Sequence, residues 1–217
     1  MISLKLKLYS NSHSVSCSKI EVALDFKSIE VDKVEAINNY ASFSPTATVP
    51  SLAIDDRVIS DSGVILEFLE ENSPHPSLLS DNAAINAQIR FMAKLVDEKL
   101  VSSIRKLFGL VKNTSHPSDN LMINNIFNEL EAHLNLLLRI KEDNIFLASS
   151  SLSLADCGTP AFFSMLKEFE IHFNHEIKKS DDFLKYEKSL NENIFLNKEY
   201  KRYGFEIRNW ISNKLLA

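Results

Sequence analysis

Residues 48–72, TVPSLAIDDRVISDSGVILEFLEEN, decide the fold of this chain. Apolar runs on either side of Asp55-Asp56 predict two short antiparallel strands joined by a tight turn. From Ser62 onward the apolar residues recur at helical spacing, which predicts a helix that Ser62 caps and that Asn72-Ser73-Pro74 ends. Val49-Pro50 stands directly before the first strand and leaves its edge uncapped. The stretch therefore predicts a surface on which a peptide-like ligand can dock.

This pattern resembles the thioredoxin-fold half of the cytosolic glutathione transferases. In that family a Val-Pro pair with a cis peptide bond precedes a strand, and an acidic-Ser pair opens the next helix. The resemblance implies that the backbone at Val49 pairs with the cysteinyl part of glutathione. It also implies that Ser62 and the helix N-terminus bind the γ-glutamyl carboxylate, while Asp61 suits its ammonium group. The expected glutathione-binding residues are Thr48, Val49, Pro50, Asp61 and Ser62, with glutathione as co-substrate.

The residues before this stretch complete a thioredoxin order. Alternating apolar residues predict a strand over residues 2–8, helical spacing predicts a helix over 20–26, and a second strand is predicted over 29–34. Together with the two strands and the helix of residues 48–72, this makes a βαβ unit followed by ββα.

The apolar period changes after Ser73-Pro74-His75-Pro76-Ser77, where two prolines and small polar residues predict a linker. Helical spacing then runs from Ile85 to Leu107 and from Leu121 to Leu138, with a turn predicted over residues 113–118. Because the chain has only 4 glycines and keeps this period to its end, the second half predicts an all-helical bundle.

The expected fold class is thus α/β plus all-α. A thioredoxin-like, glutathione-binding domain is expected over residues 1–74, a linker over 75–82 and an all-helical domain over 83–217.

A second motif, residues 146–156 (FLASSSLSLAD), resembles a capping segment of the same family. Ser153 is expected to cap a buried helix, and Asp156 to reach back to the backbone N–H of Ser153, as in a capping box. The role of this motif is in folding, so it identifies the family without locating chemistry. Cys157, which follows it, is expected in the core.

Composition excludes several other classes. The 217 residues are 45% hydrophobic, and 24 basic against 29 acidic residues give a formal charge of −5. No basic block is present, so neither nucleic acid nor a membrane surface is an expected partner. The N-terminus lacks the apolar core of a signal peptide, and no apolar run has membrane-spanning length. Two cysteines do not make a disulfide framework, so a reducing cytoplasm is the expected compartment.

The chemistry is expected where the first strand meets the first helix. Counting back from the helical residues that start at Ile20 puts Ser14 where Ser-type members of the family keep their activating hydroxyl. A hydroxyl donor at a helix N-terminus stabilises an anion over its neutral acid. Ser14 would therefore orient and ionise the glutathione thiol, without being a nucleophile itself.

Neighbouring residues compete with Ser14 for this role. Ser10, Ser12 and Ser16 could each be turn, cap or activating residues. Cys17 stands at the second cysteine position of a Cys-X-X-Cys motif whose first position is Ser14, so dithiol cycling is not expected. Cys17 is either a buried packing residue or a reactive thiol that forms mixed disulfides with glutathione.

Some positions depart from the family pattern or allow two interpretations. Ser44, Ala47 and Thr48 replace Asn, Gly and a long donor, and Thr48 is too short to reach the glycyl carboxylate. His172 and His175 are interpreted as solvated surface residues, so no metal site is predicted. Core packing is the expectation for three aromatic residues that could alternatively face substrate: Phe91, Phe108 and Trp210.

The resemblance implies a homodimeric enzyme that activates glutathione toward a small hydrophobic electrophile held between the domains. One alternative is a non-catalytic member, resembling stringent starvation protein A, that works through protein contacts. Another is a thiol oxidoreductase or isomerase that uses glutathione or Cys17. No sequence motif identifies the electrophile.

Overall fold

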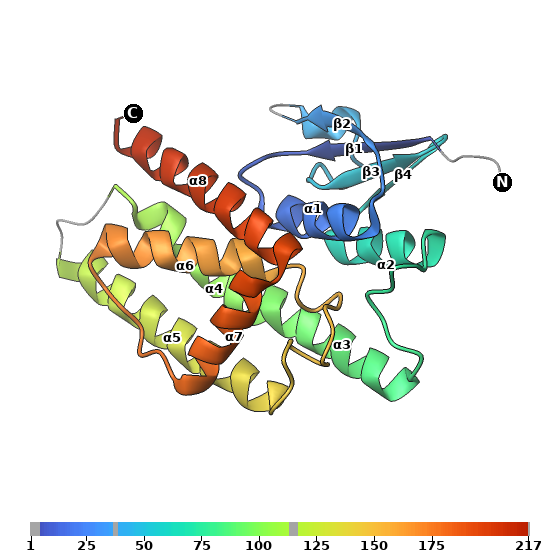
Figure 1. Cartoon of the computed structure of the whole chain (residues 1–217). Helices are drawn as coiled ribbons and strands as arrows, with labels where there is room; N and C mark the ends of the chain where they lie inside the picture. The colour runs from blue at the N-terminus through green and yellow to red at the C-terminus, as the bar shows by residue number, and fades with distance from the viewer. Residues whose placement is uncertain (1–4, 37–38, 113–116, 217) are drawn as a thin grey trace.

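A computed structural model describes residues 5–36, 39–112 and 117–216 of the chain (Figure 1). The N-terminal half contains a four-stranded sheet in the order β2-β1-β3-β4. Its strands are β1 (Leu6–Ser10), β2 (Asp32–Glu35), β3 (Ser51–Ile54) and β4 (Arg57–Ser60). β2 is parallel to β1, whereas β3 and β4 are antiparallel to their neighbours. The predicted βαβ-ββα order is confirmed, with α1 (Val15–Lys27) after β1 and α2 (Ser62–Asn72) after β4.

Both helices of this half lie on one face of the sheet, between it and the helical half (Figure 1). Alternation in β1 turns Leu6, Leu8 and Ser10 toward the buried side. Leu8 pairs with Leu52 in β3, and both side chains are almost fully buried. A short 3₁₀ turn, η1 (Tyr40–Ser42), lies between β2 and β3.

Several element boundaries differ from the sequence expectations, and α1 begins at Val15 instead of residue 20. Residues 2 and 4 of the predicted first strand lie outside the described residues. The second strand starts at Asp32 instead of residue 29, because Ser28 adopts a left-handed conformation and the Ile29 N–H bonds back to Leu24. The prediction that Ser62 caps α2 is wrong. Asp61 is the cap, and its Oδ1 accepts from the N–H groups of Gly63 and Val64.

The helical half opens with one continuous helical path from Ala83 to Leu110, as predicted. It comprises α3 (Ala83–Leu95), the π-helical segment η2 (Val96–Val101), α4 (Ser102–Arg105) and the 3₁₀ segment η3 (Lys106–Leu110). The predicted second helix is α5 (Pro117–Lys141). Residues 113–116 of the expected turn lie outside the described residues, and residues 117 and 118 belong to the helix instead of the turn. Three further helices follow: α6 (Thr159–Phe173), α7 (Asp181–Glu192) and α8 (Ile194–Leu216).

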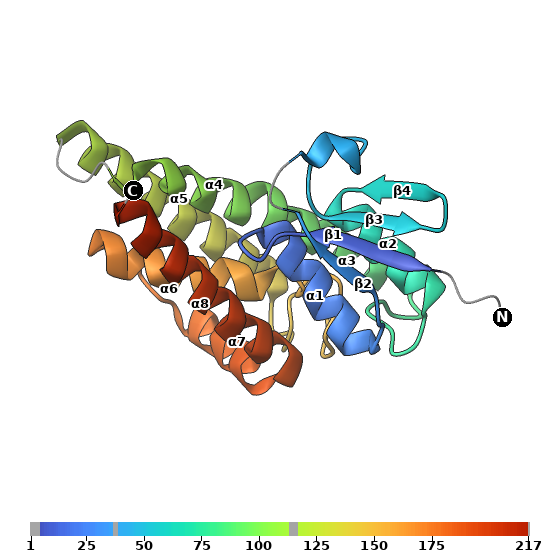
Figure 2. The same ribbon diagram turned by 90° about the horizontal axis from the view of Figure 1, so that it is seen from above.

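The helix α6 is the centre of this half, because most of its residues are buried. Phe162 and Phe169 are fully enclosed there. The helix α8 packs against both α6 and α1, and the view from above shows it running alongside each of them (Figure 2). The C-terminal helix therefore connects the bundle to the helix that leads out of β1.

The motif before α6 folds as a buried hydrogen-bond network. Asp156 accepts from the N–H of Ser153 at 3.0 Å, as predicted. Ser153 is not the cap of α6, however, because turns intervene and the helix begins at Thr159, just before Pro160. The Ser153 hydroxyl instead donates to Asp156 at 2.7 Å, and the Tyr186 hydroxyl and the Leu147 N–H donate to its other oxygen. Cys157 is fully buried, as expected.

A buried ion pair fixes the segment between α2 and α3. Lys27 and Glu70 approach to 2.6 Å with both side chains almost fully enclosed. The Lys27 ammonium also donates to the carbonyls of Ser73 and Pro76, and Glu70 accepts from Ser77 and the Leu78 N–H. None of the helices in the described ranges combines the length and apolar character needed to span a bilayer.

Candidate functional site

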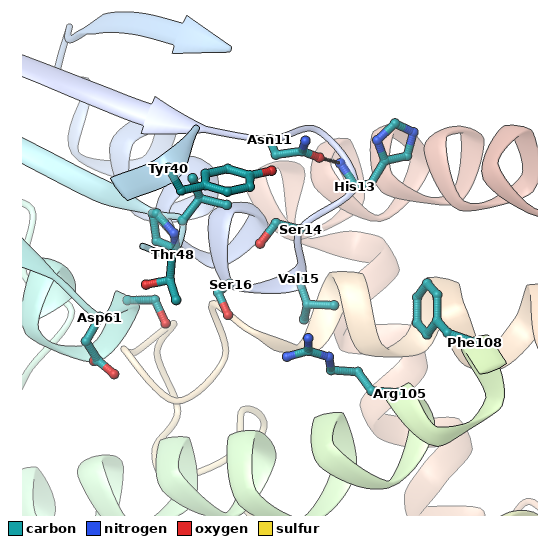
Figure 3. Close-up of a pocket in the computed structure, with 13 residues that line it drawn as sticks. Asn11, His13, Ser14, Val15, Ser16, Tyr40, Thr48, Asp61, Arg105 and Phe108 are labelled. Atoms are coloured by element: carbon teal, nitrogen blue, oxygen red, sulfur yellow. Dashed lines mark hydrogen bonds between the residues drawn. The ribbon is translucent and has the colours of Figure 1, made fainter. Parts of the chain in front are cut away.

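A cavity of about 710 Å³ opens between the N-terminal half and the long helix of the helical half (Figure 3). One wall is the loop from β1 into α1, with residues 11 and 13–16. A second wall comprises Tyr40, residues 48–50 before β3, and Asp61-Ser62 at the start of α2. Arg105 and Phe108 form the third wall, from the helical half. All six residues predicted from the sequence thus line one cavity.

Ser14 stands at the N-cap of α1, where its Oγ accepts from the Cys17 N–H at 3.3 Å. Because the oxygen is the acceptor in this bond, the hydroxyl proton stays available to a ligand. The side chain is half-buried and lies near the middle of the cavity (Figure 3). Ser14 can therefore cap its helix and donate to an anion at the same time.

The four serines considered for the activating role, Ser10, Ser12, Ser14 and Ser16, lie in different environments. Ser16 also lines the cavity, on the first turn of α1. Ser10 is buried at the end of β1, and Ser12 borders a neighbouring hollow with Glu35 and Arg202. Ser14 and Ser16 are consequently the two serines of this loop whose positions suit a role in the cavity.

Cys17 is buried, and only 2% of its surface is exposed. Its Sγ accepts from the Asn11 N–H at 3.4 Å. Burial raises the pKa of the Cys17 thiol, although the neighbouring Ser14 side chain and the hydrogen bond from the Asn11 N–H oppose that shift. A neutral, enclosed thiol fits the packing interpretation of Cys17 better than the reactive one.

The turn before β3 has the features expected of a strand-like docking edge. The Val49-Pro50 peptide is cis, as the resemblance implied. Among the described residues, no hydrogen bond involves the backbone of Val49. The Thr48 hydroxyl lies 2.6 Å from that of Thr46, and buried Ser44 accepts from the Thr48 N–H at 3.1 Å. Ser44 therefore holds the turn, and Val49 presents free backbone groups beside the cavity.

Asp61 and Ser62 form the far end of the same wall. Asp61 has φ of 80° and ψ of 121°, a positive-φ conformation that is unusual outside glycine. Its Oδ1 is used by the helix cap, while within the described ranges Oδ2 has no hydrogen-bond partner. Ser62 is 9% exposed and its hydroxyl is likewise unpaired there. This end offers a carboxylate oxygen, a hydroxyl and a helix N-terminus to a zwitterionic group.

Arg105 was not predicted from the sequence, and Phe108 was expected in the core. Phe108 is half-buried and lines the cavity, with Phe169 and Trp210 packed edge-on against its ring at 5.2 and 4.7 Å. Arg105 and Phe108 are three positions apart, and this spacing was the available signal that they share a face. Trp210 packs as expected, whereas Phe91 is 47% exposed on α3, contrary to the expectation of core packing.

His172 and His175 both contact neighbouring residues, whereas the sequence predicts them to be solvated on the surface. His172 Nε2 lies 3.1 Å from the Val111 carbonyl, and the His175 ring stacks on Phe127 at 4.3 Å. Over residues 5–36, 39–112 and 117–216, no three His, Cys, Asp or Glu side chains gather in a way that could hold a metal ion.

Comparison with known proteins identifies the family to which this sequence is similar. Residues 8–77 match the family described as glutathione S-transferase, N-terminal domain. A maleylacetoacetate isomerase of Dictyostelium discoideum is 30% identical over 177 residues, which are 72% of this chain and 77% of that protein. A stringent starvation protein A homolog of Haemophilus influenzae is 22% identical, over 77% of this chain and 78% of that protein.

A similar fold is found among solved structures. A rice glutathione S-transferase in complex with glutathione superposes with a TM-score of 0.81, covering 99% of this chain and 98% of the rice chain at 18% identity. The mixed sheet followed by a helical region is therefore shared over nearly the full length.

Proposed function

The chain belongs to the glutathione S-transferase family, and we propose that it binds glutathione in the cavity and activates the thiol for attack on a small electrophile. The observation that carries the proposal is the convergence of three chain segments on one cavity: Ser14 at the start of α1, the free backbone of Val49, and Asp61-Ser62. Glutathione carries the matching groups in the same order: a thiol, a cysteinyl backbone and a γ-glutamyl end. The rice relative carries glutathione in the same fold.

In this proposal the roles follow from the groups available. The Val49 backbone pairs with the cysteinyl amide, while Ser62 and the α2 N-terminus bind the γ-glutamyl carboxylate. The free Oδ2 of Asp61 pairs with the ammonium. The Ser14 hydroxyl donates a hydrogen bond to the sulfur and so favours the thiolate, which attacks the electrophile. Buried Cys17 and Cys157 take no part, and their thiol state fits a reducing, cytoplasmic compartment.

The first experiment is retention of the purified protein on immobilised glutathione and its release by free glutathione, with calorimetry for the affinity. Conjugation of 1-chloro-2,4-dinitrobenzene, followed by absorbance, then tests the transferase activity. Failure to bind glutathione by either method would refute the proposal.

Two other functions keep specific support. The isomerase relative at 30% identity favours an enzyme in which the thiolate adds to the substrate and then leaves, so that glutathione is regenerated. The short Thr48 side chain, bonded to Thr46, and the relative named for stringent starvation favour a protein-contact role. An isomerase regenerates glutathione, whereas a transferase consumes it, so measuring glutathione consumption distinguishes these two enzymes. If the protein does not stabilise the glutathione thiolate, the protein-contact role is favoured.

We further propose that the chain forms a homodimer through α2 and α3. Glu67 on α2 and Arg90 on α3 form a bidentate ion pair at 2.7 and 2.8 Å, which links these two helices. Val64 on α2 and Phe91 on α3 expose large apolar side chains, as a homodimer interface requires. Light scattering on the wild type and on Phe91→Glu tests this assembly, and a wild-type monomer would exclude it.

A further inference from the structure

Arg105 brings a positive charge into the cavity from the helical half. It is exposed, lines the cavity, and makes no ion pair or hydrogen bond with the described residues. An arginine side chain remains protonated at any physiological pH. His13 is the other basic group on the cavity wall, but it faces Glu206 at 3.6 Å. Arg105 is therefore a cation without a counterion in the described part of the chain.

The position of Arg105 separates it from the proposed glutathione groups. In Figure 3, Asp61 and Thr48 lie on one side of Ser14, and Arg105 and Phe108 lie on the other. A thiolate held at Ser14 would therefore face the Arg105 side, which is where an acceptor molecule must sit. The cavity is polarised, with a carboxylate at its glutathione end and a guanidinium at its acceptor end.

Phe108 adds a flat apolar surface beside this charge. It follows Arg105 by one helical turn, and Phe169 and Trp210 hold its ring in place. The acceptor end thus combines an apolar platform with one cation, which differs from a pocket for a purely hydrophobic electrophile.

We propose that the second substrate is an electrophile that carries a carboxylate, which binds Arg105 while the apolar part lies on Phe108. A guanidinium presents parallel N–H groups that match the two oxygens of a carboxylate. A single unpaired cation also balances one negative charge. This inference rests on the proposed glutathione function and names the substrate class of the same cavity.

The test uses a matched pair of probes, 4-chloro-3,5-dinitrobenzoate and 4-chloro-3,5-dinitrobenzamide, which differ in charge and little in shape. In each reaction the glutathione sulfur forms a bond to the ring carbon, chloride leaves with the electron pair of the broken C–Cl bond, and the thiol proton passes to solvent. The two glutathione conjugates, prepared chemically, are also titrated into the protein by calorimetry, so that binding is measured without catalysis.

The wild type should bind the carboxylate conjugate at least about tenfold more tightly than the amide conjugate. Arg105→Gln should bring the two affinities together and leave glutathione affinity unchanged. The matched control is Arg139→Gln, because Arg139 is an exposed arginine on α5 that does not line the cavity. This control should retain the full preference for the carboxylate conjugate.

Equal affinities for the two conjugates in the wild type would overturn the inference while leaving the glutathione function in place. The same holds if Arg105→Gln weakens glutathione itself as much as the carboxylate conjugate, because Arg105 would then hold the glycyl carboxylate. If no glutathione derivative binds, both the proposed function and this inference fail.

Discussion

The hydroxyl of Tyr203 donates a hydrogen bond to the carbonyl of His13 at 2.9 Å, across 190 positions of sequence. His13 directly precedes Ser14. On the same helix, Arg202 donates to the Ser12 carbonyl and Glu199 accepts from the Ser18 hydroxyl. The C-terminal helix α8 therefore holds both the loop that carries Ser14 and the first turn of α1.

Replacing Tyr203 by Phe should disturb the position of Ser14 without touching the ligand. Loss of one hydrogen bond is expected to cost about 1 kcal/mol of unfolding free energy. The thiolate absorbance of bound glutathione should then titrate at a higher pH than in the wild type. Tyr200→Phe is the control, because the Tyr200 hydroxyl has no hydrogen-bond partner among the described residues. Identical thiolate titrations for Tyr203→Phe and wild type would show that α8 does not position Ser14.

Ser14→Ala should separate activation from binding. If Ser14 donates to the thiolate, the titration of bound glutathione should shift upward and conjugation should fall, while glutathione affinity changes little. Loss of the α1 cap should also lower stability by about 1 kcal/mol. Ser16→Ala, on the first turn of α1 in the same wall, is the control. A shift in Ser16→Ala but not in Ser14→Ala would transfer the activating role to Ser16.

Ser62→Ala should weaken glutathione binding, because it removes a donor to the γ-glutamyl carboxylate. Hydrogen bonds to charged groups are worth about 1.5–3 kcal/mol. Calorimetry measures the change directly, with Ser189→Ala on α7 as a distant control. Wild-type affinity in Ser62→Ala would remove Ser62 from the binding site.

Asp156→Ala should lower stability without changing ligand affinity at a temperature where the protein is folded. Four donors from Leu147, Ser153 and Tyr186 converge on this carboxylate. Leaving buried donors unpaired costs about 1–3 kcal/mol each, so the loss should exceed the ~1 kcal/mol of a simple cap. Denaturant unfolding measures it, and an unchanged midpoint would exclude a structural role for Asp156.

The Lys27–Glu70 pair should make stability fall in acid. Burial raises the pKa of Glu70, but hydrogen bonds from Lys27, Ser77 and Leu78 outweigh it and hold the pKa below the ordinary value of 4.5. A carboxyl whose pKa is lower in the folded state stabilises the fold above the unfolded pKa, and this contribution disappears as the pH falls through the folded pKa.

Glu70→Gln should therefore cost about 3–5 kcal/mol near neutral pH, since it leaves Lys27 buried without its partner. The difference in unfolding free energy from wild type should shrink as the pH drops below 4.5. Glu71→Gln, at an exposed position, is the control. A difference that stays constant down to the acid transition would contradict this linkage.

The local signals of the sequence predicted much of the fold. Alternation at Leu6 and Leu8, the Asp55-Asp56 turn and the helical spacing after Ser62 depend on a few neighbouring residues, so they can be interpreted without tertiary contacts. The same holds for the bond between Asp156 and the Ser153 N–H. Even here a local ambiguity was resolved wrongly, because Asp61 and Ser62 are both good caps and only the backbone conformation at Asp61 decides between them.

The division of the domains at residues 74 and 83 stays a prediction, and so do the roles of Ser14, Thr48, Val49, Pro50, Asp61 and Ser62. The sequence by itself determined the succession of strands and helices along the chain as far as residue 138, and the resemblance indicated the segments that could meet a glutathione-like ligand. Only the tertiary structure placed Arg105 and Phe108 across from Ser14, and Tyr203 against His13. Such residues are far apart in sequence, and their placement depends on how α8 packs against α1 and on which face of the helical half borders the cavity, which no local periodicity encodes.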